Sequence, residues 1–200
     1  MNNISAVRIE ISKHFDLKQR VEGCENTSIS PNGRYTLSTV NYIQNKPDVN
    51  WTVTKVSILD NQTRNLMFEF YTDYHSFFHE WFLKGKQEFL VGAEVLCGGQ
   101  TIINLSTKKM ESFSPMNDGF IWTDFYPSPD RNRLAVIGCF WACPYEVKIY
   151  DFSNPMTLPL PELKTVSLDE FELDKIEWRD NLHFQTFDYD GVPKKHSLDI

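Results

Sequence analysis

The chain has 200 residues, of which 41% are hydrophobic and 14% aromatic, enough apolar material for one sizeable core or one repeat array. Its formal net charge of −7, without any block of lysine and arginine, argues against nucleic acid as a partner. The N-terminal sequence lacks the apolar region of a signal peptide, and the longest apolar run, from Leu134 to Cys143, is about half of what spans a bilayer. A cytoplasmic protein that does not enter membranes is therefore expected.

The first predicted element is a strand at 6–12, because apolar and polar residues alternate from Ala6 to Ile11. Further strands follow in four groups. They are predicted at 28–29, 35–41, 52–59 and 66–70; at 80–83, 89–93, 101–104 and 110–113; at 123–126, 134–138, 145–150 and 163–166; and at 175–178, 182–187 and 195–199. A capping-box pattern from Ser167 to Glu170 predicts a helical turn at 170–175, in the connection to the last group.

Two short patterns separate these strands and recur along the chain. The first is a tight turn, "SPNGRY" from Ser30 and "SPDRNRL" from Ser128, in which proline sets the first turn position and Asn or Gly tolerates positive φ. The second is a strand ending in Asp or Asn before a polar turn: "ILDNQTR" from Ile58, "IINLSTK" from Ile102 and "IYDFSNP" from Ile149. An Asp or Asn side chain there can accept backbone hydrogen bonds and close the turn.

The copies lie about 45–50 residues apart, which is the length of a four-stranded propeller blade. This rhythm resembles WD40-type and TolB-type β-propeller repeats. The resemblance is best at Ser128–Asp130 and Ile149–Asp151, followed by Ser30–Gly33 and Ile58–Asp60. The Trp-Asp and Gly-His pairs of WD40 repeats do not occur in these copies. The resemblance implies an all-β fold, a small four-bladed β-propeller of antiparallel blades.

We expect a single propeller domain over 1–200, with blades at about 27–71, 79–114, 122–167 and 174–200. The last blade lacks a fourth strand, and the predicted strand at 6–12 would complete it, closing the ring and burying both sheet edges. Two alternatives remain open. The chain could be half of an eight-bladed ring formed by two copies, or the strands could be hairpins of a β-sandwich.

In a propeller of this order, the loops between the second and third strands and those between blades share one face. This loop face would hold all four cysteines and a set of aromatic side chains, while the opposite face holds short polar turns. The predicted binding residues on the loop face are Trp141, Phe140, Tyr145, Trp51, Tyr74, His75 and Phe78.

A metal site is conceivable on the same face, since Zn²⁺ takes about four sulfur or nitrogen ligands. The candidate ligands are Cys139, Cys143, Cys97, Cys24, His75 and His79. Their spacing does not favour a site, because no second close cysteine pair accompanies "CFWAC" and "HSFFH" lacks the order of a zinc-protease helix. Thiols packed among aromatic rings are the favoured interpretation, with a Cys139–Cys143 disulfide as an alternative. We predict no metal and no cofactor.

No nucleophile motif, phosphate-binding loop or dinucleotide fingerprint occurs in the sequence. We therefore predict a non-enzymatic binding module that recognises a protein or peptide on the aromatic, Cys/His-rich loop face, as a monomer or homodimer. Two alternatives stay open: a metal- or thiol-dependent enzyme on the same face, and a structural protein that acts through dimerisation.

Overall fold

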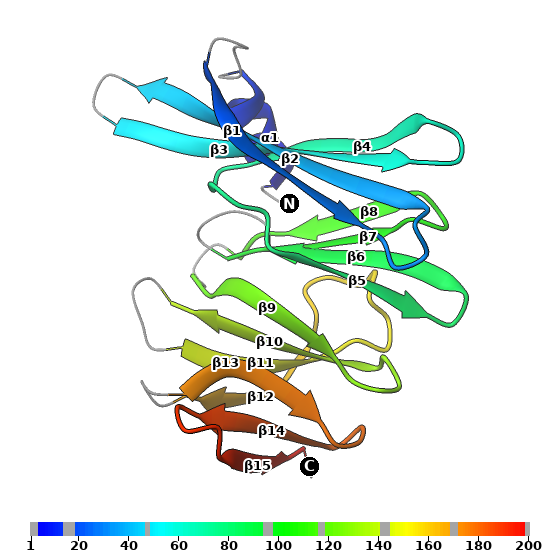
Figure 1. Ribbon diagram of the computed structural model, residues 1–200, viewed down its shortest axis with the longest axis vertical. Helices are drawn as coiled ribbons and strands as arrows, with labels where there is room; N and C mark the ends of the chain where they lie inside the picture. Colours follow the sequence, from blue (N-terminus) through cyan, green and yellow to red (C-terminus); the bar gives the residue numbers. More distant parts are fainter. Residues whose placement is uncertain are drawn as a thin grey trace. The chain divides into compact units, whose positions relative to one another are not determined.

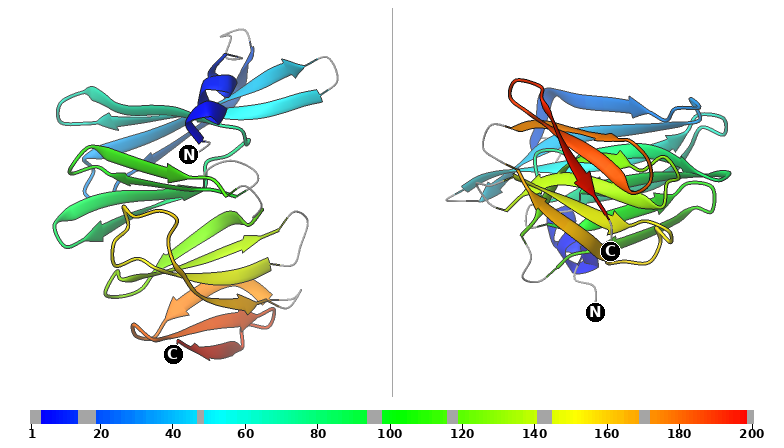
Figure 2. Two further views of the ribbon diagram at one scale, coloured as in Figure 1. Left: turned by 180° about the vertical axis from the view of Figure 1, so that it is seen from behind. Right: turned by 90° about the horizontal axis from the view of Figure 1, so that it is seen from below.

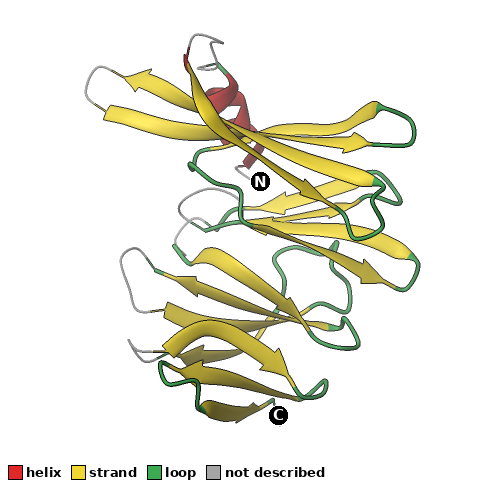
Figure 3. Cartoon of the chain, in the orientation of Figure 1, coloured by secondary structure: helices red, strands yellow, loops and turns green. Residues whose placement is uncertain are grey.

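The computed structural model describes residues 4–13, 19–46, 49–93, 98–115, 119–140, 145–168 and 172–198. The described residues form two compact units, the first running to Phe77 and the second starting at Phe78. Apart from one helix, their regular structure is antiparallel β-sheet (Figure 3). That helix is too short and too polar to cross a bilayer, and the described residues contain no other candidate.

The first unit consists of helix α1 and the four-stranded sheet A. The elements are α1 (Ile4–Ser12), β1 (Arg20–Ile29), β2 (Tyr35–Lys46), β3 (Val49–Asp60) and β4 (Asn65–Thr72), with the strands in the order β1-β2-β3-β4 (Figure 1). The helix packs on the sheet through Ile11, which is buried with Tyr42 and Val53. The guanidinium of Arg8 lies 4.6 Å from the centre of the Phe70 ring.

The strand predicted at 6–12 is wrong, because these residues belong to α1. The segment satisfies two periods at once. Ile4, Val7 and Ile11 are spaced three and four residues apart and so share one helical face, although the short run also alternates like a strand. Ile4 and Ile11 are buried in the helix. The contact of this segment with sheet A favours the helical period over the strand period. The segment therefore does not supply the fourth strand that was predicted for the last sheet.

The second unit contains three sheets in succession. Sheet B is formed by β5 (His79–Lys84), β6 (Gln87–Ala93), β7 (Gln100–Asn104) and β8 (Lys109–Phe113). Sheet C is formed by β9 (Ile121–Pro127), β10 (Arg133–Cys139), β11 (Tyr145–Asp151) and β12 (Glu162–Ser167). Sheet D is formed, in the described part of the chain, by β13 (Glu172–Trp178), β14 (His183–Asp188) and β15 (Pro193–Ser197). β13 begins within the helical turn predicted at 170–175, so residues 172–175 are strand instead.

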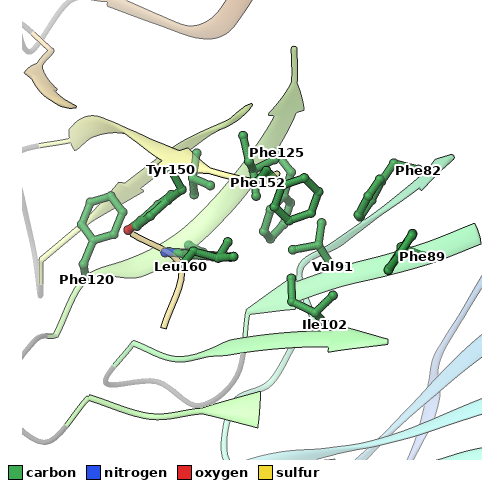
Figure 4. Close-up of a cluster of buried hydrophobic side chains, with 12 residues drawn as sticks. Phe82, Phe89, Val91, Ile102, Phe120, Phe125, Tyr150, Phe152 and Leu160 are labelled. Carbon is green, nitrogen blue, oxygen red and sulfur yellow. The ribbon is translucent and has the colours of Figure 1, made fainter. Parts of the chain in front are cut away.

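Sheet C is apolar on both faces. Successive residues of a strand point to opposite sides of the sheet, and those of β10 are apolar on both sides. Leu134 and Val136 of β10 face sheet B, and Ala135 and Ile137 face sheet D. The cluster between sheets B and C is rich in rings, and Figure 4 shows Phe82 and Phe89 directed toward Phe152. Burying each such side chain stabilises the fold by about 1.5–3 kcal/mol.

The connection between β11 and β12 also joins sheets B and C. It is the yellow segment in Figure 2, and it carries Phe152 and Leu160 into the cluster between the two sheets. The backbone N–H of Leu160 donates to Oε1 of Gln100 on β7 at 2.9 Å. The long connection is therefore part of the core of the second unit.

The predicted turns have the expected chemistry. Oδ1 of Asp60 accepts hydrogen bonds from the N–H groups of Gln62 at 2.9 Å and Thr63 at 3.2 Å. Asn104 and Asp151 cap the equivalent turns of sheets B and C in the same way. Hydrogen bonds from the hydroxyl and the backbone N–H of Ser153 lower the pKa of the Asp151 carboxyl more than burial raises it. The predicted turn is therefore confirmed in sheets A, B and C.

Candidate binding surface

Phe140 and Tyr145 stand on either side of the β10–β11 connection, and their side chains are 36% and 39% exposed. Tyr145 pairs with Cys139 in the register of β10 and β11. Trp141 and Cys143, predicted in the same loop, lie outside the described residues. The structure therefore places two of the predicted aromatic residues together at one end of sheet C.

Phe140 is held against the sheet by a buried cation. The ammonium of Lys148 lies 4.7 Å from the centre of the Phe120 ring and 5.2 Å from that of Phe140. The two rings are 5.4 Å apart, and Lys148 also pairs with Glu162 at 3.1 Å. Burial opposes ionisation of Glu162, but hydrogen bonds from Thr165 and Lys148 outweigh it and lower the pKa of this carboxyl. Cation–π contacts of this kind stabilise by about 0.5–2 kcal/mol.

Tyr189 is a further exposed aromatic residue at the same end of the second unit, in the turn between β14 and β15 (Figure 1). Its side chain is 77% exposed. The turn is fixed by Asp188, whose Oδ1 accepts from the N–H of Val192 at 2.7 Å, and by Gly191 at a φ of 79°. Tyr189 is not among the binding residues predicted from the sequence, because its one signal is a ring in an otherwise polar turn.

The remaining predicted binding residues have different environments. Tyr74 and His75 belong to the first unit, with ring centres 4.0 Å apart. Their carbonyls accept hydrogen bonds from Thr54 and Asn41 of sheet A. Trp51 lies within β3 and not in a loop, because β2 and β3 extend further than predicted. Phe78 packs against the cluster between sheets B and C.

The candidate metal ligands are spread over both units. Cys24 lies in β1 and not in the predicted loop, and Cys139 lies at the end of β10; both are half-buried. His79 begins β5 with its ring edge-on to Trp81 at 6.3 Å. Cys97 and Cys143 lie outside the described residues. Within the described ranges, no three or more His, Cys, Asp or Glu side chains form a group that could hold a metal ion.

Comparison with known proteins gives one sequence relative and several similar folds. No protein-family model matches the chain. The uncharacterised protein R762 of Acanthamoeba polyphaga mimivirus is 32% identical over 133 residues, which cover 64% of this chain and 50% of that protein. The chain thus spans about half the length of this relative.

Two solved structures are similar in fold. The Myceliophteria thermophila Cps50 (Swd1) β-propeller domain matches with a TM-score of 0.53 at 13% identity, over 95% of this chain and 54% of that one. The dihydro-heme d1 dehydrogenase NirN, solved in complex with DHE, matches with a TM-score of 0.55 at 12% identity, over 86% of this chain and 35% of that one. At such identities the likeness concerns the fold alone.

Proposed function

We propose that this chain, whose fold is that of a β-propeller, is a non-enzymatic binding module that recognises a protein or peptide. The proposed contact surface is the loop end of the second unit, which we define as Phe140, Tyr145, Tyr189 and Val192. The observation that carries the proposal is the exposure of three aromatic rings at this end. Aromatic side chains are enriched at protein interfaces, where they bury large apolar areas.

Neighbouring side chains contact Phe140 and fix the turn that carries Tyr189. The rings of Phe140 and Phe120 are tilted by 58° to each other, and both lie close to the buried Lys148 ammonium. Tyr189 projects from a turn closed by Asp188. A side chain with contacts in the free protein, such as Phe140, loses less conformational entropy when a partner covers it, which favours affinity. The opposite end of the second unit consists of turns capped by Asn104, Asp130 and Asp151.

Site-specific crosslinking tests this proposal. A photoreactive phenylalanine analogue replaces Tyr189, and the matched control carries it at Leu83, which is 57% exposed in the turn region at the opposite end. We expect a defined crosslinked partner from position 189 and none from position 83. The same partner should be lost when Tyr145→Ala is added to the position-189 variant. Equal crosslinking from both positions, or crosslinking from position 83 alone, would contradict the proposal.

We further propose that sheets A to D are four successive propeller blades contained in a single chain, with sheet D at one end of the array. Three observations support this. The four sheets share the strand order of propeller blades, the Swd1 propeller domain matches nearly the whole chain, and the side of sheet D that faces away from sheet C is polar. The helix α1 has no role as a strand in this arrangement.

A further inference from the structure

The side of sheet D that faces away from sheet C, called here the outer face of sheet D, is a polar surface. Trp178 and Phe184 point the other way and join the cluster with sheet C. By alternation, Glu177, Gln185 and Lys195 lie on the outer face. Gln185 is only 2% exposed, and its side chain accepts from Nε of Arg179 at 2.8 Å and donates to Glu177 at 3.2 Å.

A hollow of about 440 Å³ opens on sheet D between the β13–β14 turn and β15. Its lining combines the apolar side chains of Phe184 and Pro193 with polar ones from Arg179, Asp180, His183, Gln185, Lys195 and His196. The volume falls in the range of pockets that hold small organic molecules. Because the lining comes from two adjacent strands and a tight turn of one sheet, its side chains are positioned by the sheet itself.

Among the side chains that line this hollow, the basic ones, Arg179 and Lys195, outnumber the acidic one, Asp180. Lys195 has no salt bridge or hydrogen bond among the described residues. Nε of Arg179 donates to Gln185. Its Nη2 atom is 3.9 Å from the carboxylate of Glu177, which already pairs with Lys175 at 2.6 Å. Two permanent positive charges therefore face a cavity on a chain whose net charge is −7.

Asp180 is the carboxylate in the lining, and its acceptor capacity is already used. It accepts from the backbone N–H of Leu182 at 2.7 Å and of His183 at 2.8 Å, and from Nδ1 of the His183 ring at 2.9 Å. The N–H of Leu182 and the His183 ring lower the pKa of this carboxyl. Carboxylate oxygens only accept, so Nδ1 of His183 carries a proton and Nε2 remains to meet a ligand.

We propose that this hollow binds a small anion, a molecule bearing a phosphate or carboxylate group, with Arg179 and Lys195 as its charged contacts. Guanidinium groups match the geometry of both oxyanions, and an ammonium adds a point charge. Nothing in the proposed role of the loop end requires this site, which involves other residues.

Nuclear magnetic resonance titration tests the site with two probes, inorganic phosphate and citrate, each at constant ionic strength so that screening is equal. We expect saturable amide shifts confined to residues 179–185 and 194–197. Lys195→Ala and Arg179→Ala should each weaken binding at least about tenfold, since each removes a charged hydrogen-bond donor. The matched control is Lys194→Ala, which removes the same charge from the neighbouring residue of β15, on the side facing sheet C.

The outcomes separate the ligand classes. Saturation by phosphate alone assigns the site to phosphoryl compounds, saturation by citrate alone assigns it to carboxylates, and saturation by both supports a general anion site. The proposal is overturned if neither probe gives saturable local shifts, or if Lys194→Ala weakens binding as much as Lys195→Ala. The unbound spectrum of each variant checks that it is folded. Tyr189→Ala should leave anion binding unchanged, which separates this site from the loop end.

Discussion

Gly138 is the residue on which the support of the loop end depends most directly. A Cβ atom at this position would lie 2.2 Å from the carbonyl oxygen of Ile121 and 2.7 Å from the Phe120 ring. We predict that Gly138→Ala lowers the free energy of unfolding by about 1–3 kcal/mol, because backbone or ring must move to accommodate the methyl group. Urea denaturation measures the change.

Gly119→Ala is the matched control for this substitution. It adds the same methyl group one residue before Phe120, at a position where no atom lies within 4 Å of the new Cβ. We expect a change within about 0.5 kcal/mol. If the two variants were equally stable, the close packing around Gly138 would be of no energetic consequence.

At this scale the sequence identified part of the candidate surface. Phe140 and Tyr145 could be placed because they flank a connection between two well-marked strands. The role of Lys148 could not be predicted, since an alternating strand residue gives no sign that two rings contact its ammonium. Tyr189 gives no separate signal either, because it lies in a polar turn that Asp188 and Gly191 close.

Lys84 acts at the scale of elements, because it joins two sheets. It ends β5 of sheet B, and its ammonium donates to the carbonyls of Arg131 at 2.8 Å and Phe152 at 2.9 Å and to Oδ1 of Asn132 at 2.6 Å, all in connections of sheet C. Burial lowers the pKa of this ammonium, so the three acceptors compensate for lost hydration.

We predict that Lys84→Met destabilises the protein by about 1.5–3 kcal/mol, because the carbonyl groups lose a charged donor. Thermal and urea unfolding measure the loss. Lys86→Met, an identical substitution at an exposed position in the adjoining turn, should change stability by less than about 0.5 kcal/mol. An equal effect at both positions would mean that the contacts of Lys84 contribute nothing specific.

Most strands were predictable because two independent signals agree, although β1 begins at Arg20 and not at the predicted residue 28. Asp or Asn closes the turns, and alternating or continuous apolar runs mark the strands between them, as in Leu134–Gly138. For α1 the signals conflict, since its short sequence fits both a strand and a helix. The contact of Ile11 with Tyr42 and Val53 on sheet A resolves the conflict, and it involves residues far away in the sequence.

At the scale of the whole molecule, the polar outer face of sheet D bears on assembly. Sheet C is apolar on both faces, whereas the outer face of sheet D carries Glu177, Gln185 and Lys195. In repeat proteins, a polar outer face is typical of a unit that ends the array. Another propeller sheet packed there would bury the charges of Glu177 and Lys195, at a high cost in hydration.

We therefore predict that the chain is monomeric in solution. Light scattering during size-exclusion chromatography should give a mass near the 23.4 kDa of one chain over a wide concentration range. A concentration-independent mass of twice that value would instead support a ring shared by two copies.

The sequence by itself determined the all-β class, the repeat of about 45–50 residues and the positions of the turns, because these depend on local chemistry within each copy. Only the tertiary structure decided that 4–12 is a helix, that the Lys148 ammonium lies against two rings, and that Arg179 and Lys195 line one hollow. Each of these depends on contacts between residues that are distant in sequence or on separate strands, and such contacts leave no periodic pattern in the chain.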